Sequence, residues 1–128
     1  MSQAKCRILY VDDHEDSAEM MKLLLAPMNY DVVAARTCEE SLELAKSEPF
    51  DLYVLDKGLP DGSGIELCKQ LNILTPGVPC IFYTGDAYEV SRQEAEAAGA
   101  DAYVPKPDVQ KLIETVHSFL AGRECAAA

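Results

Sequence analysis

Short apolar runs recur along the chain, separated by longer stretches in which apolar residues return every three or four positions. The first pattern is typical of buried strands, and the second is typical of amphipathic helices. The predicted strands are residues 7–11, 31–35, 52–55, 80–83 and 102–104. The run 52–55 is apolar on both faces, which favours a central position in a parallel sheet.

Helices are predicted between and after these strands. Residues 17–26 and 37–46 carry the clearest helical periodicity. Three pairs combine a polar capping residue with Glu three positions later, which is a helix-start signal: Thr37 with Glu40, Ser63 with Glu66, and Asp86 with Glu89. The fourth helix is expected to end near Gly99, and Pro107 is expected to start the fifth.

The alternation of strands and helices predicts an α/β fold. Right-handed crossovers place helices on both faces of a five-stranded parallel sheet, which gives a three-layer sandwich. A chain of 128 residues is long enough for one buried core. We therefore expect a single domain over residues 1–121, and a short disordered tail over residues 122–128, which lack apolar periodicity.

The net charge of −11 repels phosphate backbones, so direct binding to nucleic acid is not expected. No apolar run approaches the ~20 residues needed to cross a bilayer, and no secretory segment is recognisable, which together indicate a cytoplasmic protein without membrane insertion. The cysteines show no C-x-x-C or metal-finger spacing and are expected to be reduced thiols: Cys6, Cys38, Cys68, Cys80 and Cys125.

Polar residues follow four of the predicted strands: Asp12 and Asp13, then Asp56, then Thr84, then Lys106. The carboxyl ends of parallel strands meet at one edge of the sheet, so these side chains should converge. Three carboxylates close together repel one another and favour a hard divalent cation. Each motif alone has a simpler interpretation as a turn or helix cap. Their succession at strand ends instead favours a phosphate-directed site.

The motifs Asp-Asp, Asp-x-x-Leu-Pro-x-x-x-Gly, Thr and Lys-Pro occur in this order. Over residues 7–120 the chain therefore resembles the response-regulator receiver family of two-component signalling. The resemblance implies a flavodoxin-like sheet with strand order 2-1-3-4-5. It also implies a signalling function in which a sensor histidine kinase or a histidine phosphotransfer protein donates a phosphoryl group. The receiver turns over no separate metabolite and is not expected to be an enzyme.

The resemblance assigns a role to each matching residue. Asp56 is similar to the phosphoacceptor. The implied ligands of Mg²⁺ (or Mn²⁺) are Asp12, Asp13, Asp56 and the backbone carbonyl of Gly58. The implied phosphoryl contact and switch residues are Lys106, Thr84 and Tyr103, with the Tyr103 ring outward before phosphorylation. The downstream partner or effector is expected to bind the face formed by helix four, strand five and helix five.

Some positions depart from the family pattern. Lys57 stands where an apolar residue is usual, and Gly58 stands where a side chain often shields the phosphoryl group, so the lifetime of the phosphorylated form is left open. Gly85 replaces a frequent Ala. His14 is expected to face solvent rather than to bind metal.

Three other functions fit the sequence less well. A haloacid-dehalogenase-like phosphatase needs a second Asp where Gly58 stands. A flavodoxin-like electron carrier needs a phosphate-binding loop where the acidic Asp12 and Asp13 lie. A degenerate receiver that only binds proteins would normally lack an acidic residue or the lysine, and none is missing here.

Overall fold

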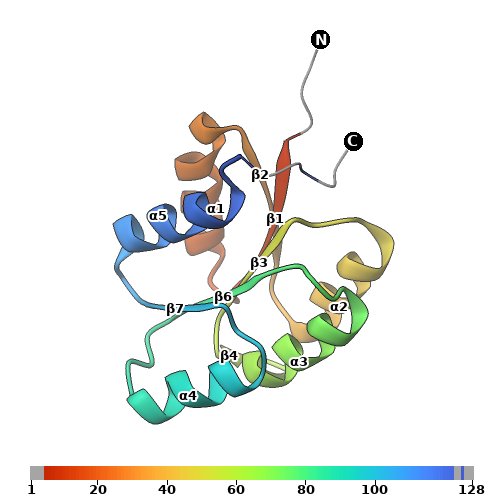
Figure 1. Cartoon of the computed structure of the whole chain (residues 1–128), viewed down its shortest axis with the longest axis vertical. Helices are drawn as coiled ribbons and strands as arrows, with labels where there is room; N and C mark the ends of the chain where they lie inside the picture. Colours follow the sequence, from red (N-terminus) through yellow and green to blue (C-terminus); the bar gives the residue numbers. More distant parts are fainter. Residues whose placement is uncertain (1–4, 123–124, 126–128) are drawn as a thin grey trace.

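The computed structural model describes residues 5–122 and 125. One parallel sheet runs through the molecule, with helices on both faces (Figure 1). Its strands are β1 (Cys6–Val11), β2 (Tyr30–Ala35), β3 (Leu52–Leu55), β6 (Cys80–Thr84) and β7 (Ala102–Pro105). The helices are α1 (Glu15–Leu25), α2 (Cys38–Ser47), α3 (Gly64–Leu74), α4 (Glu89–Ala97) and α5 (Val109–Leu120), and the short 3₁₀ helix η1 (Ala26–Met28) follows α1.

The strand order is β2-β1-β3-β6-β7. The two remaining strands, β4 (Gly58–Leu59) and β5 (Gly62–Ser63), form a small antiparallel hairpin outside this sheet. The predicted order 2-1-3-4-5 is therefore confirmed, because β6 and β7 are the fourth and fifth strands of the main sheet. The predicted α/β class is confirmed as well.

The sheet separates two apolar cores. Met21 of α1 and Val116 of α5 pack in one core, while Leu67 of α3 and Ala95 of α4 pack in the other. Residues 8–11 of β1 alternate between these cores, as the period of two in a strand requires. Every residue of β3 is buried, which agrees with its predicted central position.

Two predicted helix starts are confirmed. The Thr37 side chain accepts a hydrogen bond from the Glu40 amide, and the Ser63 side chain accepts one from the Ile65 amide. Each of these bonds satisfies an amide that has no partner within its helix.

The other two predicted starts are wrong by two or three residues. Helix α4 begins at Glu89 rather than at Asp86. Its N-cap is Tyr88, and Asp86 precedes the helix with its side chain bonded to Lys57, Ser91 and the Tyr88 amide. Helix α5 begins at Val109, and its cap is Asp108, whose side chain accepts from the Lys111 amide. Pro107 precedes this cap and does not start the helix.

The cysteines are only partly as expected. Cys6 and Cys125 form a disulfide with Cα atoms 5.0 Å apart, which corrects the prediction that all the thiols are reduced. A sequence separation of 119 residues gives no local signal for this pairing. Cys38, Cys68 and Cys80 are free thiols.

The predicted disordered tail over residues 122–128 falls largely outside the described residues, of which only 122 and 125 belong to it. Within the described part of the chain, every helix is too short or too polar to cross a membrane.

Candidate phosphoryl-transfer site

The sheet brings the predicted site residues to its carboxyl edge. Asp12 and Asp13 follow β1, and Asp56 follows β3. The Asp56 amide donates to the Val11 carbonyl at 3.0 Å, which extends the pairing of β3 with β1. The Lys106 amide donates to the carbonyl of the residue that ends β6, Thr84, at 2.8 Å. Backbone hydrogen bonds therefore fix how the four strand ends lie beside one another.

A cation lies between two carboxylates of this edge. The ammonium nitrogen of Lys106 is 2.7 Å from Asp12 Oδ2 and 3.2 Å from Asp56 Oδ2. Asp12 is 2 % exposed and Asp56 is 9 % exposed. Burial raises the pKa of Asp12, but hydrogen bonds from Lys106 and His14 outweigh it and leave this pKa below its usual value. The buried carboxylate is thus held in its charged form.

The same electrostatics act on Lys106. Partial burial lowers its pKa, but the hydrogen bond to Asp12 and the charges of Asp12 and Asp56 outweigh burial, so the pKa is raised. Lys106 therefore stays protonated over the physiological range and can meet a phosphoryl oxygen as a cation.

A third carboxylate completes an acidic cluster. Ligand atoms of Asp12, Asp13, His14 and Asp56 all lie within 4.8 Å of one another. The Asp13 side chain is 37 % exposed, so the cluster opens to solvent on its side. Three carboxylates offer the hard oxygen donors that Mg²⁺ prefers. The residues therefore fit a divalent metal ion.

His14 was expected to face solvent, and its side chain is 69 % exposed. It nevertheless contacts the cluster, since its Nδ1 lies 2.9 Å from Asp12 Oδ1 and 3.3 Å from Asp13 Oδ1. A hydrogen bond to Asp12 and the charges of both carboxylates raise the pKa of His14. Sequence reasoning missed this contact, although His14 directly follows the acidic pair.

The loop after Asp56 is folded tightly on itself. The Gly64 amide donates to the Lys57 carbonyl at 2.7 Å, and a Cβ atom at residue 64 would lie 2.0 Å from the Asp56 carbonyl oxygen. Only glycine fits there, which explains the last position of the Asp-x-x-Leu-Pro-x-x-x-Gly motif. Gly58 lies in this loop and is exposed, and the use of its carbonyl as a metal ligand stays a prediction.

The hairpin turn of this loop also reaches helix α2. Asp61 accepts hydrogen bonds from the amides of Cys38 at 2.8 Å and Glu39 at 3.1 Å. These bonds lower the pKa of Asp61. The sequence did not identify this contact, because the hairpin strands are too short to be recognised.

The predicted switch residues lie on the far side of the site. Thr84 is 3 % exposed, and its hydroxyl accepts a long hydrogen bond, 3.4 Å, from the Asp86 amide. The Tyr103 ring stacks on Phe82 with centroids 6.1 Å apart, and its hydroxyl donates to the Asp86 carbonyl. The expected outward ring is thus not observed: Tyr103 is partly buried and turned toward the β6–α4 loop.

Lys57 has two side-chain partners that sequence reasoning did not find. Its ammonium nitrogen lies 2.8 Å from Asp86 Oδ2 and 2.8 Å from Ser91 Oγ. The partners are 29 and 34 residues away along the chain. The unusual lysine beside Asp56 was the only available signal.

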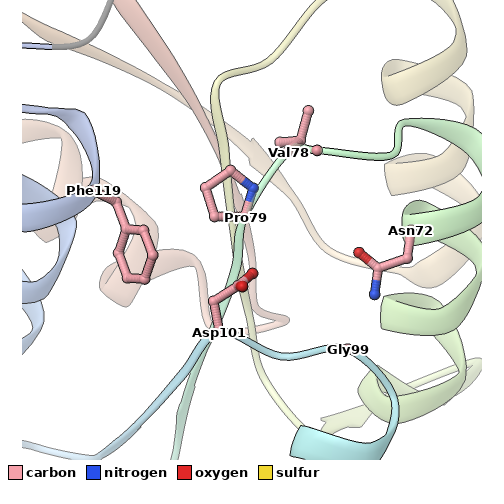
Figure 2. Close-up of a pocket in the computed structure, with 7 residues that line it drawn as sticks. Asn72, Val78, Pro79, Gly99, Asp101 and Phe119 are labelled. Carbon is pink, nitrogen blue, oxygen red and sulfur yellow. The ribbon is translucent and has the colours of Figure 1, made fainter.

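A cavity of about 480 Å³ lies at the opposite edge of the sheet, before β6 and β7. Figure 2 shows Asp101 between Asn72 of α3 and Phe119 of α5. The polar groups on its wall already bond to backbone: Asp101 accepts from the Cys80 amide, and Asn72 donates to the Ala98 carbonyl. The acidic edge therefore remains the candidate site.

The profile of the response regulator receiver domain matches residues 8–117. The chain belongs to this family. It is a receiver domain of two-component signalling, and receivers are signalling domains. Its matched segment contains every residue assigned to the site.

Curated relatives agree with the family. The receiver is 39 % identical over 122 residues to the alkaline phosphatase synthesis transcriptional regulatory protein PhoP of Bacillus subtilis, covering 94 % of this chain and 51 % of that protein. It is 36 % identical over 121 residues to the response regulator protein PilR of Pseudomonas aeruginosa, covering 94 % of this chain and 27 % of PilR. The chain thus spans about half the length of these relatives or less.

Solved structures agree with the fold. A CheY-like receiver domain protein from Methanospirillum hungatei superposes with a TM-score of 0.85 at 35 % identity, covering 90 % of this chain and 93 % of that one. The response regulator TrrA from Thermotoga maritima, in complex with Mg²⁺ and a beryllium fluoride, superposes with a TM-score of 0.80 at 32 % identity, covering 90 % and 99 %.

Proposed function

We propose that the receiver accepts a phosphoryl group on Asp56 from a sensor histidine kinase or a histidine phosphotransfer protein. The observation that carries this proposal is the Lys106 ammonium group between the carboxylates of Asp12 and Asp56. This arrangement gives a buried nucleophile with a cation already beside it. Asp13 borders the same cluster on its solvent side.

The proposed metal is Mg²⁺ (or Mn²⁺), held by Asp12, Asp13, Asp56 and the Gly58 carbonyl. When bound, the metal supplies charge neutralisation for the incoming phosphoryl oxygens. The metal and Lys106 together balance the three carboxylates, so the site can admit an anion. TrrA, the relative in complex with Mg²⁺ and a beryllium fluoride, supports this choice.

The chemistry is a transfer between two nucleophiles. A carboxylate oxygen of Asp56 forms a bond to phosphorus while the phosphorus–nitrogen bond of the donor histidine breaks, and the imidazole keeps the electron pair and takes up a proton from solvent. Lys106 moves its hydrogen bonds from the carboxylates to a phosphoryl oxygen. Asp12 and Asp13 lie beside Asp56 and would hold the metal next to the incoming phosphoryl group.

Phosphorylation of Asp56 would change the surface to which a downstream partner binds. The Thr84 hydroxyl turns to the phosphoryl group, the β6–α4 loop that contacts the inward Tyr103 ring adjusts with it, and the face of α4, β7 and α5 then binds a downstream protein or effector domain. A cavity of about 230 Å³ already lies between Tyr103, Arg92 and Lys111 on this face. Of the two switch residues, Tyr103 lines this cavity.

Residues 1–121 form the receiver domain, with residues 122–128 as its tail. The chain acts in the cytoplasm, turns over no separate metabolite and makes no direct contact with nucleic acid, in keeping with a net charge of −11.

The deciding experiment is phosphorylation with acetyl phosphate and Mg²⁺, followed by intact-mass analysis. The protein without substitutions should gain a single phosphoryl group, and the Asp56→Asn variant should gain none. The matched control is Asp16→Asn, which removes an exposed carboxylate from the start of α1 and should leave modification unchanged. Stoichiometric modification of Asp56→Asn at another residue would refute the proposal.

A further inference from the structure

The two oxygens of the Asp12 carboxylate have different partners. Oδ2 accepts from the Lys106 ammonium group at 2.7 Å and from the Tyr10 hydroxyl at 3.3 Å. Oδ1 is instead in contact with His14, whose amide nitrogen and ring Nδ1 both lie 2.9 Å from it. A metal ion that binds Oδ1 therefore need not displace Lys106.

Three possible ligand atoms gather on the Oδ1 side. His14 Nδ1 is 2.9 Å from Asp12 Oδ1 and 3.3 Å from Asp13 Oδ1. Neighbouring ligands of an octahedral ion, each about 2.1 Å from the metal, are about 3.0 Å apart. The separations between the ring nitrogen and the two carboxylates are therefore close to those that a shared ion requires. A ligand atom of Asp56 lies within 4.8 Å of all three.

His14 lies where an ion from solvent would enter the cluster. Its side chain is 69 % exposed, whereas Asp12 and Asp56 are buried. Its backbone is extended at the N-cap of α1, and the hydrogen bond from its amide to Asp12 holds it beside the acidic pair. The ring can therefore meet an incoming ion without a change in the backbone.

We propose that His14 is a further ligand of the metal site and makes the site favour Mn²⁺ and Co²⁺ relative to Mg²⁺. Mg²⁺ binds oxygen donors, whereas imidazole nitrogen suits transition metals. An octahedral ion takes six donors, so the four ligands already proposed leave one position for His14 and one for a phosphoryl oxygen. The inference rests on the proposed function, because it concerns the metal of the same site. It replaces the sequence expectation that His14 does not bind metal.

The first test is the ratio of metal affinities, measured by titration calorimetry at one pH on a chain without a histidine tag. His14→Asn removes the ring nitrogen, offers an oxygen donor and keeps a residue suited to a helix start. The affinity ratio of Mn²⁺ to Mg²⁺ should fall about threefold, and that of Co²⁺ to Mg²⁺ about tenfold, because affinity for nitrogen donors rises along this series. If His14 only hydrogen-bonds to Asp12, its loss changes all three affinities by the same factor. Constant ratios would therefore overturn the proposal.

The matched control is the other histidine of the chain. The sequence contains two histidines, and His117 of α5 is exposed, with its Nδ1 2.9 Å from the Tyr30 hydroxyl. His117→Asn should leave both affinity ratios unchanged. Equal falls in the two variants would contradict a specific role for His14.

The second test observes the ligand directly. Substoichiometric Mn²⁺ is added, and pulsed electron paramagnetic resonance detects the nitrogen of a coordinated imidazole as a modulation of the electron spin echo. The nitrogen signal should be present in the protein without substitutions and in His117→Asn, and lost in His14→Asn. Its absence from the protein without substitutions, or its persistence in His14→Asn, would refute ligation by His14.

The two proposals can fail separately. If the protein without substitutions accepts no phosphoryl group on Asp56 and binds no beryllofluoride, a phosphoryl mimic, then the proposed function fails, whereas a nitrogen signal from His14 would still assign the ligand. If Asp56 is phosphorylated in the presence of Mg²⁺ and the nitrogen signal is absent, then only the role of His14 is wrong.

Discussion

The ammonium group of Lys106 lies 2.7 Å from the carboxylate of Asp12, which is 2 % exposed. Lys106→Met would leave this carboxylate buried without its cation. We expect the free energy of unfolding to fall by about 1–3 kcal/mol without Mg²⁺, less than for a fully buried pair because Lys106 is 22 % exposed.

Urea denaturation with and without Mg²⁺ measures this change, and Mg²⁺ should recover part of the loss. Lys111→Met, which removes an exposed lysine of α5, is the matched control. Equal stabilities of the two variants would contradict a structural role for the Lys106–Asp12 pair.

Protonation of Asp86 should weaken the local structure around its side chain at low pH. Hydrogen bonds from Lys57, Ser91 and the Tyr88 amide lower its pKa from 3.8 to about 2. The depressed folded-state pKa means that the stabilising contribution is present above the unfolded value and is lost as the pH falls from 3.8 through about 2. Lys57→Met should move the Asp86 pKa back toward 3.8. Carbon chemical shifts of the Asp86 carboxyl group measure this, and an unmoved pKa would exclude Lys57 as the main cause.

Asp13 should matter for metal binding more than for folding. Asp13→Ala removes a proposed ligand and one of three mutually repelling carboxylates. We expect weaker Mg²⁺ binding and slower phosphorylation by acetyl phosphate, with thermal stability without Mg²⁺ unchanged or slightly higher. Titration calorimetry measures the Mg²⁺ affinity of Asp13→Ala. The control variant is Asp16→Ala, which removes an exposed carboxylate of α1. An Mg²⁺ affinity equal to that of the control would remove Asp13 from the ligand set.

Gly64 should be intolerant of any side chain. A Cβ atom there would lie 2.0 Å from the Asp56 carbonyl oxygen, so the backbone of the phosphoacceptor must shift. Gly64→Ala should lower the free energy of unfolding by about 1–3 kcal/mol and slow phosphorylation. Gly85→Ala is the control, since nothing lies within 4 Å of its added Cβ. Comparable rates and stabilities in both variants would show that the loop yields easily.

Thr84 should carry the signal away from Asp56. Binding of beryllofluoride should shift amide resonances over residues 84–90 and 102–106, and Thr84→Ala should diminish the shifts near Tyr103 while those near Asp56 persist. The sheet should remain intact, because the Thr84 carbonyl accepts from the Lys106 amide irrespective of the Thr84 side chain. Shifts confined to the Asp56 loop in the unmodified sequence would refute this switching scheme.

Most of the sheet was predictable because each strand is a short, mostly apolar run bounded by polar or turn residues. The run 52–55 was predicted with its exact bounds, since residues 51 and 56 are both Asp. The site followed from this, as Asp12, Asp56 and Lys106 each come directly after a strand. Residues that directly follow parallel strands lie at the same carboxyl edge of the sheet, so their side chains converge there.

What escaped prediction depends on contacts between distant segments. Asp86 carries a local helix-start signal, yet its side chain bonds to Lys57 and helix α4 starts at Glu89 instead. The inward Tyr103 hydroxyl depends on a carbonyl 17 residues away. The spacing of residue types along the sequence predicts contacts between near neighbours and does not predict contacts between distant segments.

The order of the strands has a consequence for synthesis. The N-terminal half, through α3, carries all three carboxylates of the site, whereas Thr84 and Lys106 are added only with β6 and after β7. As the chain leaves the ribosome, β2, β1 and β3 can pair before the lysine exists. The nascent half therefore gathers negative charge without its internal counter-ion. Docking of β7, which brings Lys106 to Asp12, completes the sheet and supplies the site's internal cation in the same step.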